Sequence, residues 1–145
     1  MKELDQITGT LSKPSKMPGW SYGLPAKECK TGSKLAKIPG TVCNSGDIQS
    51  LDHLKKIFAV CILTPDVNHW MPTREAGILA QVTPEEVPAN LIIRASATKI
   101  DGAPTCSWPW TSTVVTEGKT CPAAEQDNKC GSCRACWDKS IPNIA

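Results

Sequence analysis

The clearest hydrophobic pattern in the chain covers residues 50–63. Ser50 is a preferred N-cap residue, and after it apolar side chains recur three and four positions apart. The apolar stripe consists of Leu51, Leu54, Ile57, Phe58, Cys61 and Ile62. Lys55 and Lys56 fall on the opposite side, where water can solvate them. This pattern predicts an amphipathic helix over the whole range, with His53 facing the solvent.

Three shorter apolar runs predict β-strands after this helix, at residues 69–71, 91–95 and 113–116. We expect the second strand to be buried, because a nearly continuous apolar run suits a strand that is covered on both faces. Thr73 and Thr83 are candidate caps for two further helices. Helices that alternate with short apolar strands predict parallel βα units, and hence an α/β fold.

The chain divides by composition into three segments. Residues 1–44 are interrupted by proline and glycine, which predicts an irregular N-terminal strap. Residues 45–117 hold the βα pattern, and residues 118–145 form a cysteine-rich C-terminal tail with little apolar mass. The chain has 145 residues, whereas a closed eight-fold barrel typically needs ~250 residues. We therefore expect a partial, barrel-like parallel sheet whose open edge is covered by the strap or by another chain.

Composition and motifs exclude several classes of function. The net charge of +2 argues against broad electrostatic binding to nucleic acid, so base stacking by Trp108 and Trp110 is the least favoured hypothesis. No run of 18 apolar residues is present, so a membrane partner is not expected. The first residues lack the apolar core of a secretory signal, and we expect a cytoplasmic protein with reduced thiols. Motifs for phosphate loops, nucleophile elbows and zinc proteases are absent, so no catalytic residue is assigned.

Four cysteines of the tail carry the strongest chemical signal: Cys121, Cys130, Cys133 and Cys136, spaced C-x8-C-x2-C-x2-C. Zinc sites usually combine two separated C-x2-C pairs, whereas a C-x2-C-x2-C run with a distant fourth cysteine is closer to iron–sulfur ligation. The spacing therefore favours a 4Fe–4S cluster, with zinc as the alternative and disulfides or free thiols as a third interpretation. A tail with so few apolar residues would be organised by what it ligates. Cys61 is better explained as a buried small hydrophobe.

Three further residues are candidates for binding a cofactor. Asp47 precedes the predicted helix, and Arg74 and Glu75 follow the strand predicted at residues 69–71, in loops that often carry binding groups. Arg74 can grip a carboxylate or a phosphate in bidentate fashion. The alternatives are a turn or cap role for Asp47 and a surface ion pair between Arg74 and Glu75. Arg94 lies inside an apolar run, where a buried arginine needs a partner unless it marks the strand end at a pocket.

Two blocks of sequence together resemble a phage family known as Gene product 88. The first block contains P-G-W-S-Y, P-A-K-E-C-K-T-G and P-G-T-V-C within residues 18–43. The second contains S-G-D, H-W-M-P-T-R-E and T-S-T-V-V within residues 45–115 and continues to the C-terminal cysteines. The resemblance covers nearly the whole chain. It implies a phage or prophage origin, and hence the cytoplasm of a host cell as the location.

The chain departs from the family pattern after Cys43. The family resemblance implies a second thiol turn there, Cys-x-x-Cys-Tyr-Ala, and a long segment after it, whereas here Cys43 runs directly into the S-G-D motif. A central segment therefore reads as missing. The full pattern is similar to that of radical SAM enzymes, which implies a partial βα barrel, an N-terminal three-cysteine site and an auxiliary cluster in a C-terminal extension. Cys29 and Cys43 supply two matching thiols of that N-terminal site, so we do not expect radical chemistry in this chain.

Overall fold

The computed structural model describes residues 10–23, 47–104 and 106–145. The chain forms two compact units, Met1–Gln49 and Ser50–Ala145, which are described separately. None of the helices in the described ranges could span a lipid bilayer.

The first unit contains a short antiparallel pair of strands. β1 (Thr10–Ser12) pairs with β2 (Ser21–Gly23) inside the segment that was predicted to be irregular. Gly19 lies between the two strands with φ of +76°, a left-handed conformation that glycine adopts without steric cost. Cys29 and Cys43 lie outside the described residues.

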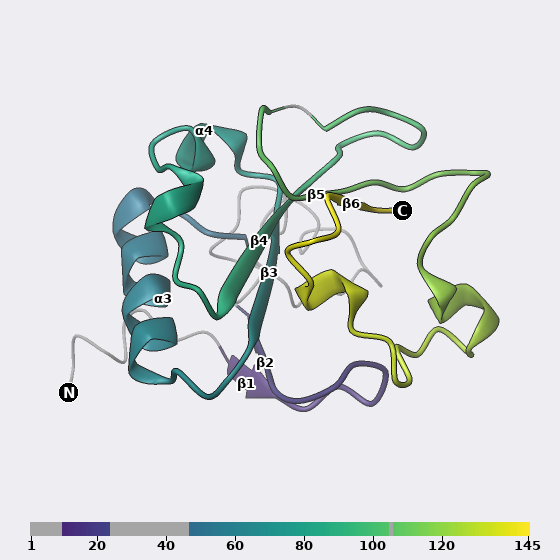
Figure 1. Ribbon diagram of the computed structural model, residues 1–145, viewed down its shortest axis with the longest axis horizontal. Coiled ribbons are helices and arrows are strands. Elements are labelled where there is room, and N and C mark those ends of the chain that lie inside the picture. The colour runs from purple at the N-terminus through teal and green to yellow at the C-terminus, as the bar shows by residue number, and fades with distance from the viewer. Residues whose placement is uncertain (1–9, 24–46, 105) are drawn as a thin grey trace, which may run out of the picture. The chain divides into compact units, whose positions relative to one another are not determined.

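The second unit is built on a four-stranded sheet in the order β3, β4, β5, β6 (Figure 1). The strands are β3 (His69–Thr73), β4 (Leu91–Ser96), β5 (Thr111–Ser112) and β6 (Asn143–Ile144). All neighbouring strands run parallel, and Met71 pairs with Ile93 in the first ladder. The sheet is not closed in the described residues. The predicted α/β fold with parallel βα units is confirmed.

Helix α3 (Leu51–Leu63) confirms the helix predicted from the first hydrophobic pattern. The hydroxyl oxygen of Ser50 accepts a hydrogen bond from the amide of His53 at 3.1 Å, as an N-cap residue does. The buried face of the helix is rotated from the predicted one toward His53, which is buried, and away from Ile62, which is 67% exposed. Those two predictions are wrong, because both residues lie at the border of the apolar stripe and tertiary contacts decide such positions.

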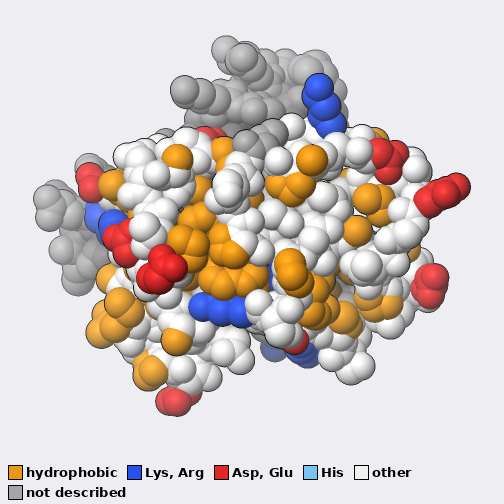
Figure 2. Space-filling model, turned by 45° about the horizontal axis from the view of Figure 1, so that its top comes forward, with side chains coloured by type: hydrophobic (Ala, Val, Ile, Leu, Met, Phe, Trp, Pro, Cys, Tyr) orange, Lys and Arg blue, Asp and Glu red, His pale blue; other side chains and the backbone are white. Residues whose placement is uncertain are grey.

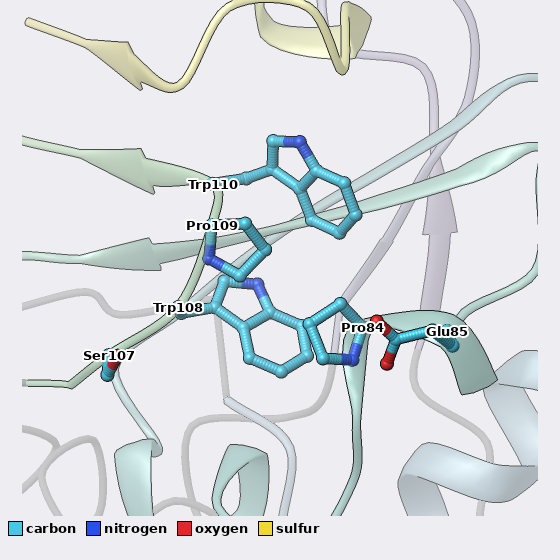
Figure 3. Close-up of a pocket in the computed structure, with 6 residues that line it drawn as sticks. All are labelled: Pro84, Glu85, Ser107, Trp108, Pro109 and Trp110. Carbon is cyan, nitrogen blue, oxygen red and sulfur yellow. The ribbon is translucent and has the colours of Figure 1, made fainter.

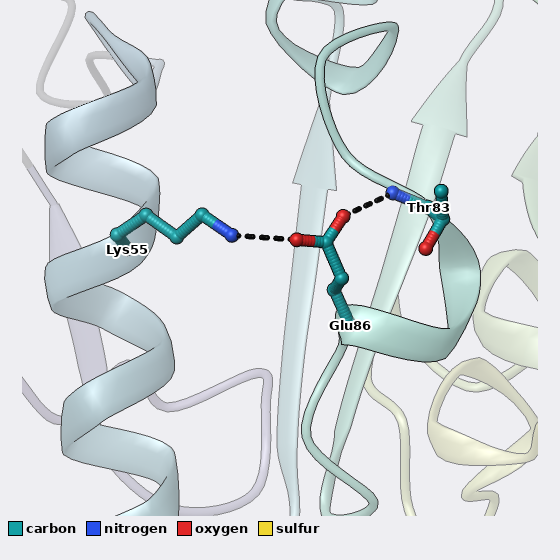
Figure 4. Close-up of polar contacts among 3 residues, drawn as sticks. All are labelled: Lys55, Thr83 and Glu86. Atoms are coloured by element: carbon teal, nitrogen blue, oxygen red, sulfur yellow. Dashed lines mark hydrogen bonds and ion pairs between the residues drawn. The ribbon is translucent and has the colours of Figure 1, made fainter.

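The connection from β3 to β4 contains α4 (Ala76–Leu79) and the single 3-10 turn η2 (Pro84–Glu86). The carboxylate of Glu86 accepts a hydrogen bond from the amide of Thr83 at 2.7 Å and forms an ion pair with Lys55 of α3 at 2.9 Å (Figure 4). The amide hydrogen bond and the Lys55 ammonium lower the pKa of Glu86. This exposed ion pair connects α3 to η2, which forms where the sequence predicted a helix beginning at Thr83.

β4 is buried along nearly its whole length, as its apolar run predicts. All residues from Leu91 to Ala95 are buried, and Arg94 is fully buried among them. In Figure 1, α3 and α4 lie to one side of β3 and β4, and the C-terminal tail lies to the other. Because side chains alternate along a strand, Ile93 and Ala95 point to the face opposite Arg94. Arg94 is therefore a charged side chain among the otherwise apolar residues 91–95 of β4.

The strand predicted at residues 113–116 is wrong. β5 ends before it, and Val114 is 57% exposed. The carbonyl of Val114 accepts from the amide of Asp101 at 2.8 Å, and the amide of Thr116 donates to the Asp101 carboxylate at 2.8 Å. A turn around Asp101 therefore holds this segment. The fourth strand of the sheet is supplied instead by β6, which follows the cysteines.

Candidate metal centre

Four cysteine side chains of the C-terminal tail line one small cavity. They are the cysteines singled out by their spacing: Cys121, Cys130, Cys133 and Cys136. The other lining residues are uncharged: Pro122, Ala123, Ala135 and Trp137. The cavity has a volume of about 20 Å³. The fold therefore gathers all four thiols around a shared space.

Two of these cysteines sit at short 3-10 turns. Cys121 directly precedes η3 (Pro122–Glu125), and Cys136 lies inside η4 (Ala135–Trp137). Proline at the first position of η3 supports this turn, because its fixed φ suits a helical start. The two turns bring the first and last cysteines of the motif to the same cavity.

The other two cysteines lie on a tight reverse turn. The amide of Cys133 donates to the carbonyl of Cys130 at 3.0 Å. Gly131 between them has φ of +54°, and a Cβ atom there would lie 3.0 Å from the side-chain oxygen of Gln126. A residue other than glycine at position 131 would strain this turn, so the conformation of the turn depends on Gly131.

The electrostatic environment of the Cys136 thiol includes the other three cysteines of the tail. Burial is the largest cause that raises the pKa of the Cys136 thiol, and the nearby Cys121 thiol adds to it. The positive charge of Arg94 opposes both effects. All six described cysteines are free thiols rather than disulfides. A cation bound among these thiols would reverse the raised pKa, because metal binding replaces the thiol proton.

The four thiols are donors of the kind that bind a metal as thiolates. Their side chains are not arranged in a metal-coordinating geometry in this structure. Sulfur ligands select zinc, copper(I) and iron–sulfur clusters. Four cysteines are the number that a structural zinc site or a 4Fe–4S cluster takes from protein. Among the described residues, no group of three or more Cys, His, Asp or Glu side chains is already spaced to hold an ion. The fit therefore rests on the kind and number of donors and on their common cavity.

Arg94 connects the sheet to this centre. Its side chain is fully buried, and its guanidinium donates to backbone carbonyls. The acceptors lie 2.9–3.3 Å away and belong to Thr111, Ala135, Cys136, Asp138, Ile141 and Pro142. Burial lowers the pKa of the guanidinium, while the neighbouring Cys136 and Asp138 act in the opposite direction. The sequence identified Arg94 as a charged residue in an apolar run. It could not predict these acceptors, because they are backbone carbonyls distant in the sequence.

Other contacts also fasten the tail to the sheet. The indole N–H of Trp110 donates to the carbonyl of Lys139 at 3.0 Å, and the Lys139 ammonium donates to the carbonyl of Pro88 at 3.2 Å. The amide of Thr111 donates to the carbonyl of Pro142 at 2.8 Å. The expectation that a ligand alone organises the tail is therefore incomplete, because hydrogen bonds to the sheet hold it as well.

Two of the three residues predicted to bind a cofactor, Arg74 and Glu75, do not line the thiol cavity. Arg74 and Glu75 follow β3 and are exposed, and Glu75 is the N-cap residue of α4. The carboxylate of Asp47 accepts a hydrogen bond from the neighbouring amide of Ile48 at 2.8 Å. Asp47 belongs to the first unit, so its position relative to the centre is not described. A turn role for Asp47 accounts for its bond to Ile48, and a cap role for Glu75 accounts for its place before α4.

Two tryptophans border a wider surface hollow of about 620 Å³ (Figure 3). It is lined by Pro84, Glu85, Ser107, Trp108, Pro109 and Trp110. Trp108 is 9% exposed, and its indole N–H donates to the carbonyl of Ile93 at 2.8 Å. Little of the Trp108 side chain is therefore open to a stacking base, whereas Trp110 is half-buried. Figure 2 shows that hydrophobic side chains gather in the middle of one face, with charged side chains of both signs beside them.

A second pair of tryptophans adjoins the thiol cavity. Trp137 lines the cavity, and its ring centroid lies 5.4 Å from that of Trp70 on β3. The indole N–H of Trp70 is buried and has no hydrogen-bond partner among the described residues. The fluorescence of this pair is therefore a natural reporter of changes at the centre.

The comparisons with known proteins give one match. The profile of the family described as Gene product 88 matches residues 37–139, which include the sheet strands β3 to β5 and all four cysteines. No curated protein and no solved structure matches the chain.

Proposed function

This chain belongs to the Gene product 88 family, and we propose that it binds a 4Fe–4S cluster through Cys121, Cys130, Cys133 and Cys136. The observation that carries the proposal is the common cavity that these four side chains line. Thiolates are the protein ligands of such clusters, and a bound cluster would supply one-electron transfer. The role of the chain itself is to hold four sulfur atoms around one space.

The spacing of the ligands supports a cluster over a single ion. Three cysteines lie on a C-x2-C-x2-C run, and the turn from Cys130 to Cys133 is already closed by its own hydrogen bond. Such a run is closer to iron–sulfur ligation than to the paired turns of a zinc site. The free thiols agree with a reducing compartment, for which we propose the cytoplasm of a phage host cell.

A zinc-stabilised structural module is the second candidate, and the size of the cavity favours it. About 20 Å³ is little more than the space that one water molecule needs. One zinc ion needs less space than a cluster, which would require the lining residues to move apart. The zinc candidate needs no redox chemistry.

A relation to radical SAM enzymes is a further part of the proposal. The parallel sheet with a cysteine-rich segment beside it agrees with the arrangement that this relation implies. The N-terminal cysteines on which such chemistry would depend, Cys29 and Cys43, lie outside the described residues. We therefore assign no catalytic step to this chain.

Metal analysis after purification without oxygen tests the proposal. We expect about four iron atoms and four acid-labile sulfides per chain, with a brown colour. About one zinc per chain without sulfide would replace the cluster by the second candidate, and a protein without bound metal would contradict both. Cys61→Ala is the matched control, because Cys61 is buried in α3 and does not line the cavity.

A further inference from the structure

We propose that Arg94 is the positioning residue of the thiol centre: it holds the backbone around Cys136 in place before any metal binds. The proposal concerns the metal-free chain and deepens the proposed function, on which its metal-binding part rests. It starts from the six carbonyl contacts of the buried guanidinium.

The contacts of Arg94 are distributed in a way that fixes the tail. Five of the six acceptors belong to residues 135–142, and the sixth, Thr111, belongs to β5. The Nε atom donates to the carbonyl of Cys136 itself at 2.9 Å. A guanidinium presents its N–H donors in a rigid planar fork, so it fixes the relative positions of the carbonyls that it binds. The turn that carries Cys136 is therefore folded around a side chain of the central strand.

The charge of Arg94 has a second consequence for the same site. Within the part of the chain that the structure describes, the ion pairs Lys55–Glu86 and Lys129–Asp127 do not involve Arg94. The carboxylate of Asp138 interacts favourably with the Arg94 charge, but Asp138 is exposed, and burying a charge is costly even when carbonyl dipoles solvate it. A centre of four thiolates is an anion, and Cys136 brings it next to this cation. Arg94 thus favours ligand sets whose bound form carries net negative charge.

Arg134 provides a matched comparison within the tail. It also carries a permanent positive charge near the cysteines, and its guanidinium donates to the carbonyls of Gly131 and Cys133 at 2.8 Å. Arg134 is exposed, however, and its acceptors are at most three residues away in the sequence. It can stiffen one turn but cannot join the tail to the sheet.

Hydrogen exchange of the metal-free protein, with chelator and reductant present, tests the positioning role. In the wild-type chain we expect protected amides at Trp137, Asp138 and Ile141, which donate to carbonyls within the tail. In Arg94→Lys and Arg94→Gln these amides should exchange at least about tenfold faster, the equivalent of losing one hydrogen bond to a charged group. Arg134→Lys should leave them unchanged.

Amides of α3 report whether an effect is local. Unchanged protection in α3 together with faster exchange in the tail supports the proposal. Unprotected tail amides in the metal-free wild type, or full protection in Arg94→Gln, would overturn it. Loss of α3 protection in both variants would also overturn it, because Arg94 would then support the whole unit rather than the centre.

Zinc affinity, measured by competition with a chromophoric chelator, tests the link to the metal site. We expect Arg94→Gln to bind zinc about 10–100-fold more weakly than wild type, as when other outer groups of a metal site are removed. Equal affinities would show that Arg94 does not act on the centre. If the wild type binds neither zinc nor a cluster, the proposed function fails, while hydrogen exchange still decides the positioning role.

Discussion

The central strand β4 and the C-terminal tail lie in the same unit, yet different interactions order them. β4 is held by the burial of apolar side chains and by ladder hydrogen bonds to β3 and β5. The tail contains few buried apolar side chains, and it is held by hydrogen bonds from Arg94 and Trp110 to its carbonyls. A strand of the first kind forms with no ligand, whereas a segment of the second kind depends on single polar groups. The comparison predicts which changes damage the whole unit and which damage the centre alone.

The largest effect on stability should come from Ile93→Ala. Ile93 is fully buried on β4, and truncation of a buried isoleucine costs about 2–5 kcal/mol through lost burial and a residual cavity. Urea unfolding followed by circular dichroism measures this loss. Ile62→Ala on the exposed side of α3 should change stability by less than about 0.5 kcal/mol. Similar losses in the two variants would mean that β4 is not the core of the unit.

Cys133→Ala should damage the tail without unfolding the sheet. We expect stoichiometric metal to be lost, because one of the four proposed ligands is missing, and the tryptophan fluorescence near Trp137 to become insensitive to added metal. Elemental analysis and fluorescence titration measure the two effects. Ser132→Ala is the matched control, since Ser132 is next in the chain but does not line the cavity. Full metal content in Cys133→Ala would show that Cys133 is not a ligand.

Cys61→Ala should affect only the core. We expect unchanged metal content and a loss of about 1–2 kcal/mol, because a small buried side chain is removed from α3. Burial raises the pKa of the Cys61 thiol from 9.0 to about 11. The folded state therefore keeps this thiol neutral, and its contribution to stability, present below pH 9.0, is lost as the pH rises toward 11.

Unfolding measured between pH 8 and 11, roughly the range over which this thiol changes its charge, separates the two sulfur environments. The wild type should lose stability in this range, and Cys61→Ala should lose less. Metal loss from Cys61→Ala, or an identical pH profile, would contradict the division of the cysteines into core and centre.

The smallest effect should come from Glu86→Gln at the exposed contact with Lys55. The pKa of Glu86 is lowered in the folded state by the Thr83 amide and by Lys55, so its contribution is present above the unfolded pKa and is lost as the pH falls through the folded value. The variant should show a shallower loss of stability in acid. Because exposed ion pairs contribute little, a large loss at pH 7 would mean that this contact supports the core.

The sequence predicts the two elements with the clearest apolar patterns, α3 and β4. α3 is marked by a helical period and by Ser50, and β4 is marked by a continuous apolar run. Strands β5 and β6 have only two residues each, so pairing rather than propensity decides where they form. The apolar run at residues 113–116 was therefore a misleading signal.

The four cysteines could be predicted as a group because their spacing is a local property of the chain. Arg94 could not be assigned its role in the same way. Its acceptors lie 17–48 residues further along the chain and are backbone carbonyls. Every residue has a backbone carbonyl, so the sequence does not indicate which ones accept from Arg94. Only the unusual position of a charge within an apolar run marked it.

The route of the chain between β5 and β6 has a consequence for metal exchange. These adjacent strands flank all four cysteines, so both ends of the cysteine loop are fastened to the same sheet. The entropy cost of closing the loop is then met by strand pairing and not by the bound group. If the proposed centre binds an ion or cluster, that group would leave and return while the two strands keep the ends of the loop in place.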